Sequence, residues 1–489
     1  MRRVVHELPK YNIFTFFTFF CHCLLSDKSK KRYFVIFLGS YFFYGYANPK
    51  ILLVLILVTL ISYVGGLILG CKKSKGLFIF FFFLEIAVLL VFKYTNFAVM
   101  NISYFANYFL GKNVEINWNI LLPVGLSFMI FQACTYLSEV YRNQIDVEKN
   151  IIMYAAFVAF FPTVLSGPIQ KAKVLLPQIK SPSEFDVQRG KKGTLLFVWG
   201  FFEKVMVANK LNLIYMSIIP DYSNRSSAEI LIGAIAFSLY IYADFSSYSD
   251  MARGISMILG IDIGKNFNNP YLSQSTAEFW NRWHISLNEW FIENVYIPLG
   301  GNRKGITRKY INMLIVFLIS GLWHGAHWHF VVWGVLNGVL AIIGLILKPA
   351  RNYVYEKLNV DESVESIVAI KRIIVFYLIT LTWIFFTSGI MDSIGIWKKI
   401  LLFNYLSIFN SNLLNIAGTA VGTFVTMITT IIFCKIQIKR QHENLLYEKY
   451  EKQPFFMQSL IVAIAICICI FGASVTSANV NTQFLYFQF

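Results

Sequence analysis

Apolar runs of about 20 residues recur along this 489-residue chain, and they constrain its fold more than any other feature. A run of that length crosses the hydrocarbon core of a bilayer as a helix, which satisfies its own backbone hydrogen bonds there. Hydrophobic residues make up 57% of the sequence and charged residues only 14%, against about 25% in soluble domains. This composition excludes a disordered chain and an ordinary cytosolic enzyme, and it predicts an all-α polytopic membrane protein.

The runs place the candidate membrane segments at about 11–25, 33–47, 50–70, 77–99, 119–140, 151–168, 193–219, 228–258, 309–325, 328–347, 370–390, 413–434 and 457–475. The 151–168 run contains two prolines and a glycine between basic loops, so we expect a broken or re-entrant segment. The 193–219 run carries Glu203 and Lys204, so part of it must face protein or water. We therefore predict about 11–13 transmembrane or re-entrant helices.

The net charge of +17 comes from basic residues clustered in short loops between the apolar runs. This is the pattern that the positive-inside rule produces, so we expect a lipid bilayer as the partner and no nucleic acid. The rule places loops such as 169–192 and 259–308 in the cytoplasm. It also places any helix lying along the membrane surface in these loops on the cytoplasmic side.

Polar residues of the 228–258 run form a candidate site wall. In the segment Tyr240–Arg253, the side chains of Tyr240, Asp244 and Tyr248 share one helix face. Two interpretations remain open: a hydrogen-bonded seam between helices, or the polar wall of a substrate tunnel that includes Asp244.

The segment 275–291 predicts an amphipathic helix at the cytoplasmic interface. Ser275 and Glu278 have the spacing of a capping box, and tryptophans then recur on one face. His284 falls on that apolar face, one turn after Trp280. It is either a functional residue or a histidine of the membrane interface whose ring nitrogens form hydrogen bonds with neighbouring groups.

His324 is the residue most in need of explanation. It lies 15 residues beyond Lys309, which marks the cytoplasmic end of its span, and so about 22 Å along the helix and inside the membrane. A neutral imidazole there can act as a general base, taking a proton from a hydroxyl that attacks an activated acyl carbon. The alternatives are a structural histidine, or a metal site with His327 and His329. The seven cysteines form no C-x-x-C pair, so we expect no metal.

Three motifs together resemble the membrane-bound O-acyltransferase family. They are Trp280-Asn-Arg-Trp-His284-Ile-Ser-Leu, Tyr296-Ile-Pro-Leu-Gly-Gly301 and Gly321-Leu-Trp-His324-Gly. Upstream, Pro123-Val-Gly-Leu-Ser-Phe128, Ser166-Gly-Pro-Ile169 and Tyr242-Ala-Asp-Phe-Ser-Ser-Tyr-Ser-Asp250 are similar to the bacterial branch, which includes the alginate O-acetylation protein and the D-alanyl transfer protein of teichoic acids. The length of the chain resembles the alginate type more, but Asn337 departs from that type, which often has histidine there.

The resemblance implies a single acyltransferase domain over residues 1–489, with helices around a central tunnel in a bacterial cell membrane. The motif core would cover about 119–347, and the helices at 370–475 would be peripheral. It implies that His324 is catalytic and that His284, a second important polar residue nearer the cytoplasmic mouth, belongs with it to the catalytic residues. Further candidate substrate-binding residues are Asp244, Asn281, Arg282 and Trp323.

These residues and the resemblance predict an O-acyltransferase. We expect it to take an acyl group, most simply acetyl from acetyl-CoA or another acyl thioester, for O-acetylation of a cell-surface or exported polysaccharide. An extracytoplasmic acetyltransferase is the expected partner. The sequence carries no Walker or Rossmann phosphate loop, so we expect no bound cofactor. Three alternatives stay open: D-alanyl transfer to teichoic acid, a transporter or flippase, and a non-catalytic scaffold.

Overall fold

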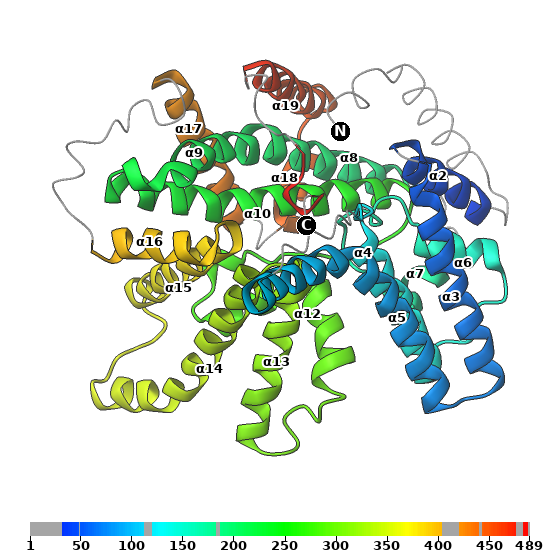
Figure 1. Ribbon diagram of the computed structural model, residues 1–489. Coiled ribbons are helices and arrows are strands. Elements are labelled where there is room, and N and C mark those ends of the chain that lie inside the picture. Colours follow the sequence, from blue (N-terminus) through cyan, green and yellow to red (C-terminus); the bar gives the residue numbers. More distant parts are fainter. Residues whose placement is uncertain are drawn as a thin grey trace. The chain divides into compact units, whose positions relative to one another are not determined.

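The computed structural model describes residues 32–47, 49–111, 120–181, 186–402, 420–439, 443–475 and 483–487 (Figure 1). Every regular element in these ranges is a helix, which confirms the all-α prediction. Among them, seven helices are long and apolar enough to cross a membrane: α3, α4, α10, α13, α14, α15 and α17. The predicted segment at 11–25 lies outside the described residues, and the number of full crossings stays a prediction.

The chain divides into two compact units, and the division falls inside helices α8 and α10. The first unit comprises the described part of residues 1–196 together with 252–264. Its helices are α2 (Arg32–Ala47), α3 (Ile51–Cys71), α4 (Lys75–Leu110), α5 (Leu126–Tyr141), α6 (Ile151–Val158), α7 (Ala172–Lys180) and the start of α8 (Val187–Phe202). Nearly all of α5 is buried, and it packs against α3 and α4.

The predicted break in the 151–168 run is confirmed. Helix α6 ends at Val158 and turns follow it. The chain that leaves the helix is paired: the amide of Phe161 donates to the Ser40 hydroxyl at 3.1 Å, and Gln170 donates to the Ile263 carbonyl at 3.1 Å. A non-helical backbone buried in protein is tolerated for this reason.

The second unit comprises the described part of residues 197–251 and 265–489. It holds the rest of α8, the π-helical segment η1 (Glu203–Ala208), α9 (Asn209–Ile218), α10 (Ser227–Ile258) as far as Met251, α11 (Thr276–Arg282), α12 (Ile285–Phe291), α13 (Ile306–His324), α14 (Trp328–Lys357), α15 (Glu365–Thr387), α16 (Ile390–Leu401), α17 (Ala420–Lys439), α18 (Glu443–Glu451) and α19 (Phe455–Val475). All the predicted site residues belong to this unit.

Helices α13 and α14 lie side by side in the second unit, and glycine allows their backbones to approach (Figure 1). A Cβ atom on Gly321 of α13 would lie 2.3 Å from the Phe330 carbonyl oxygen, and one on Gly334 of α14 would lie 2.4 Å from the Phe317 carbonyl oxygen. Because these contacts are with backbone atoms, no rotamer change could relieve them. The two glycines therefore fix the register of α13, whose last residue is His324.

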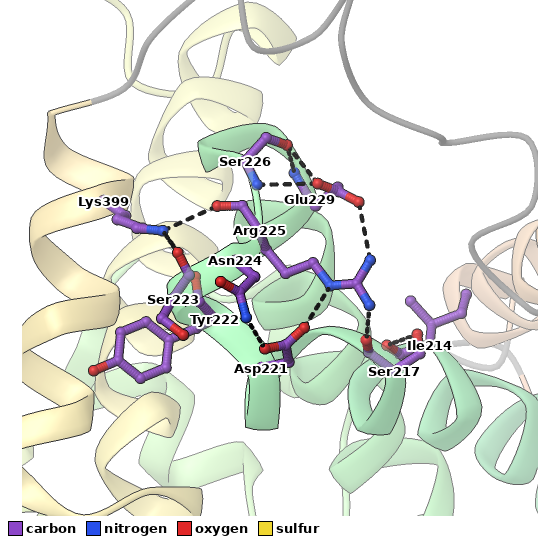
Figure 2. A network of polar contacts seen from close by, with 10 residues as sticks. All are labelled: Ile214, Ser217, Asp221, Tyr222, Ser223, Asn224, Arg225, Ser226, Glu229 and Lys399. Atoms are coloured by element: carbon purple, nitrogen blue, oxygen red, sulfur yellow. Dashed lines mark hydrogen bonds and ion pairs between the residues drawn. The ribbon is translucent and has the colours of Figure 1, made fainter.

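A polar network anchors the start of α10 (Figure 2). The amide of Glu229 donates to the Ser226 hydroxyl at 3.2 Å, and the amide of Ser226 donates back to the Glu229 carboxylate at 3.0 Å, which makes a capping box. Lys399 of α16 donates to three carbonyl oxygens of the preceding turn, those of Tyr222, Ser223 and Arg225. These contacts fix the end of the helix that carries Asp244.

The predicted continuous amphipathic helix at 275–291 is wrong. The helix does start at Ser275, whose hydroxyl accepts from the Glu278 amide at 3.1 Å. It ends at Arg282, and a second helix, α12, begins at Ile285. Between them His284 adopts a left-handed conformation with φ 45°, which interrupts the helical hydrogen bonding. The histidine thus projects from a break between two short helices and not from a helix face.

Candidate active site

His324 is the last residue of α13 and is buried, with 4% of its surface exposed. The chain becomes extended at Gly325, so the helix breaks where the flanking glycines predict. Added to Gly325, a Cβ atom would lie 2.0 Å from the Phe330 ring. The sequence around the histidine therefore allows close packing on the side of the turn into α14.

Aromatic rings surround the His324 imidazole. Their centroids lie 4.9 Å away for Trp323, 5.0 Å for Trp333, 5.2 Å for Phe386 and 5.8 Å for Tyr486. Such a wall excludes water from the ring, and electrostatic interactions are stronger in a site without water.

His284 lies in the same part of the second unit. Its ring centroid is 4.7 Å from that of Phe245, 6.1 Å from that of Trp323 and 6.3 Å from that of Tyr486. Trp323 and Tyr486 thus contact both histidines. The structure brings together the two residues that the sequence singles out as catalytic, although 40 positions separate them along the chain.

The protonation state of His284 follows from its neighbours. Burial lowers the pKa of its imidazole to about 3, so the ring is neutral near pH 7. Its Nδ1 lies 3.2 Å from Asn266 Oδ1, and that oxygen also accepts from the Ser286 hydroxyl at 2.9 Å. Because Oδ1 is an acceptor, Nδ1 carries the proton and the ring lone pair is on Nε2. Asn266 is a positioning residue that selects this tautomer.

Asp244 of α10 forms a buried ion pair with Lys204 of η1. The distance from Lys204 Nζ to Asp244 Oδ1 is 2.6 Å, and the side chains are 8% and 1% exposed. The other carboxylate oxygen accepts from the Leu485 amide at 2.7 Å. Asp244 lies on a helix whose next residue, Phe245, packs against His284. It therefore stands close to the histidines while its own oxygens bind Lys204 and Leu485.

Asn281 and Arg282 are placed differently. Asn281 is exposed, and Arg282 is partly exposed and pairs with Glu278 at 2.7 Å. The Arg282 guanidinium also donates to the Asn268 carbonyl oxygen at 3.3 Å. These two side chains lie at the surface of α11, outside the aromatic wall around the histidines, so their role in binding substrate stays a prediction.

Several residues of the site escape analysis of the sequence. Phe386 comes from α15, a part of the chain expected to be peripheral, yet it packs against His324. Leu485 and Tyr486 carry no recognisable motif. The unusual polarity of the 193–219 run was the one available signal for Lys204, and the π-helical turn that presents Lys204 is a feature often found at functional sites.

Asn337 marks the departure from the alginate-type pattern, and it is fully buried in α14. It accepts from the Thr382 hydroxyl at 3.1 Å and donates to the Trp333 carbonyl oxygen at 2.8 Å. Its polar groups are thus paired within the helical core. Trp333 itself belongs to the wall around His324.

Comparison with known proteins identifies the relatives of this chain. The sequence profile of the membrane-bound O-acyltransferase family matches residues 36–390. A probable alginate O-acetylase of Pseudomonas putida is 30% identical over 98% of each chain. A peptidoglycan O-acetyltransferase of Helicobacter pylori is 30% identical over 73% of this chain and 71% of its own length. A teichoic acid D-alanyltransferase of Bacillus subtilis is 26% identical over 45% of this chain and 58% of its own.

The family match extends from α2 into α16 and includes both histidines. Together with the seven apolar helices, it identifies a multi-pass protein of the bacterial cell membrane that catalyses O-acyl transfer. This chain belongs to the membrane-bound O-acyltransferase family.

Proposed function

We propose that this O-acyltransferase takes an acetyl group from a cytoplasmic thioester, most simply acetyl-CoA, for O-acetylation of a cell-surface or exported polysaccharide. The observation that carries the proposal is the meeting of His284 and His324 at one aromatic wall, with Trp323 and Tyr486 touching both. Two imidazoles in a dry site suit the movement of a proton between a hydroxyl and a thiolate.

In this mechanism His324 is the general base. Its imidazole takes the proton of the acceptor hydroxyl while that oxygen attacks the acyl carbonyl carbon. The carbon–sulfur bond then breaks, and the leaving thiolate receives the proton from the imidazolium. An alternative consistent with the same geometry is that His324 itself carries the acyl group transiently.

His284 would position the thioester donor. Its neutral ring can accept a hydrogen bond at Nε2, because Asn266 holds the proton at Nδ1. The basic loops at 259–308 support a cytoplasmic entrance for the donor, since His284 belongs to this stretch of chain. Arg282 at the surface of α11 could meet a phosphate group of such a donor, because a guanidinium pairs well with phosphate.

The acceptor assignment is supported by the relatives. The alginate and peptidoglycan relatives described above each match more than 70% of this chain, and both are named for O-acetyl transfer. The D-alanyltransferase covers less than half of it. We therefore favour acetyl over D-alanyl transfer, with an extracytoplasmic acetyltransferase receiving the group on the outer side.

Ester analysis of the cell surface tests this function. A deletion strain is rescued with wild type or with His324→Ala at matched membrane levels, and polysaccharide O-acetyl content is measured. We expect only the wild type to restore the acetyl esters. Full restoration by the variant would refute the role of His324. If deletion leaves acetyl esters unchanged and reduces D-alanyl esters, the acetyl assignment is wrong.

A further inference from the structure

The last described segment, residues 483–487, lies against α10 within the second unit (Figure 1). Main-chain groups hold it there. The amide of Leu485 donates to Asp244 at 2.7 Å, and the Gln483 carbonyl oxygen accepts from Lys204 at 3.2 Å. The buried ion pair between Lys204 and Asp244 therefore grips the backbone of this segment at two points.

These two hydrogen bonds help to offset the unfavourable free energy of burying the ion pair. Removing two charges from water is unfavourable, and their attraction compensates only when further hydrogen bonds satisfy the remaining lone pairs and protons. Here the segment supplies such a bond to each partner. Leu485 serves the second carboxylate oxygen of Asp244, and Gln483 serves the ammonium group of Lys204.

The side chains of the segment fill the space beside the histidines. The centroid of the Tyr486 ring lies 4.0 Å from that of Phe245, 5.8 Å from that of His324 and 6.3 Å from that of His284. The Phe484 ring lies 5.2 Å from that of Tyr248 and 4.4 Å from the ammonium group of Lys204. Only 7% of Tyr486 is exposed.

We propose that residues 483–487 form a strap that completes the transfer site. The pair of Lys204 and Asp244 would hold the strap by its backbone, and Tyr486 would cover both imidazoles. This inference rests on the proposed function and deepens it: the strap orients His284 and His324 and keeps water away from the activated acyl group. Water exclusion matters because a thioester at the site can otherwise be hydrolysed.

The first test uses full-length protein in proteoliposomes with an acetyl thioester and a soluble hydroxyl acceptor. Acetyl transfer and thioester hydrolysis are measured in parallel. We expect Tyr486→Ala to lower transfer at least tenfold and to raise the ratio of hydrolysis to transfer. Phe433→Ala is the matched control, because it also removes a ring that is only 1% exposed in the same unit. It should leave the ratio of hydrolysis to transfer unchanged.

In the opposite hypothesis, residues 483–487 block the site and must move away before substrate can bind. It predicts that Tyr486→Ala raises transfer, so a rate at or above that of wild type overturns the strap. A drop in transfer with the same hydrolysis ratio as Phe433→Ala also contradicts it, because that result would reflect general loss of packing. Only the combined loss of transfer and gain in relative hydrolysis supports the proposal.

A second test reports on the strap without any acyl chemistry. Tyr248→Cys and Phe484→Cys are introduced together into the full chain, and a short bismaleimide is added. The two proteins that carry only one of these substitutions control for the seven native thiols. We expect a cross-link between the two positions in the double variant and at least a tenfold lower yield when Asp244→Asn is added. Unchanged yield with Asp244→Asn would refute the grip.

The two tests separate the proposals. If the cross-link depends on Asp244 but no protein transfers acetyl, the proposed function fails and the strap remains. If wild type transfers acetyl while the cross-link never forms, the function remains and the strap is wrong.

Discussion

Replacing Gly334 with alanine should destabilise the packing of α13 on α14 and displace His324. The added methyl group would lie 2.4 Å from the Phe317 carbonyl oxygen and 3.2 Å from Gly321 Cα. Both atoms belong to the backbone, so the clash can be relieved only by moving one helix. Gly344 offers a matched control on the same helix, because its added methyl would meet only the Thr276 hydroxyl oxygen, at 3.6 Å.

The magnitude follows from these contacts. Overpacking of a closely packed interior costs about 1–3 kcal/mol, whereas alanine in a helix is favoured over glycine by about 0.5–1 kcal/mol. Gly344→Ala should therefore be neutral or stabilising. Because both substitutions gain this helix preference, it cancels between them, and the stability of Gly344→Ala should exceed that of Gly334→Ala by about 1–3 kcal/mol.

Heating of the detergent-solubilised proteins measures this difference. The midpoint temperature for loss of the monodisperse fraction should fall for Gly334→Ala and should hold or rise for Gly344→Ala. Well below both midpoints, Gly334→Ala should also transfer acyl groups more slowly, because His324 ends the displaced helix. Equal midpoints for the two variants would refute the argument that backbone contact at Gly334 sets the helix spacing.

Three further predictions concern single residues of the second unit. In the folded protein the pKa of His284 is about 3, whereas in the unfolded chain it is near 6.5, so the contribution of His284 to stability is present above pH 6.5 and falls by roughly 2 kcal/mol at pH 5. The thermal midpoints at pH 7 and pH 5 should therefore differ less in His284→Asn than in wild type. An equal difference in the two proteins would count against a buried neutral ring. Ser226→Ala removes the cap on the Glu229 amide and should cost about 1 kcal/mol, again read from the thermal midpoint; no change would mean that the capping box is not needed. Arg282→Gln breaks a partly exposed ion pair with Glu278 and should change stability by less than about 1 kcal/mol. The same substitution should raise the KM for the thioester, and an unchanged KM would show that Arg282 does not bind the donor.

The membrane helices were largely predictable, because the length and apolarity of a run report directly on its ability to cross a bilayer. The break after Val158 was predictable for a different reason, because a proline inside a helix removes a backbone hydrogen bond and clashes with the preceding turn. His324 was also recognisable as a candidate site residue, because an imidazole between glycines inside an apolar run is energetically unfavourable unless it has a partner or a function.

The break at His284 was not predictable. The tryptophan spacing around it suits a continuous helix, whereas hydrogen bonds that the His284 ring and the Ser286 hydroxyl donate to Asn266 Oδ1 stabilise the left-handed turn. Such a contact spans 18 positions and leaves no local pattern. The place of Tyr486 in the site was also not predictable. Its segment contacts α10 across 241 positions, and nothing in the neighbouring residues indicates such a partner.

The proposed acyl transfer depends on His324 more than on any other residue. The most direct measurement reconstitutes wild type, His324→Ala and His324→Gln in proteoliposomes at equal folded amounts, supplies acetyl thioester with a labelled acetyl group, and counts the label that reaches a hydroxyl acceptor. Removal of a general base typically costs 10²–10⁴-fold in rate, so both variants should fall by at least about a hundredfold while their thermal midpoints stay near that of wild type. Label transfer by a well-folded His324→Ala protein at the wild-type rate would contradict the proposed role of His324 as general base.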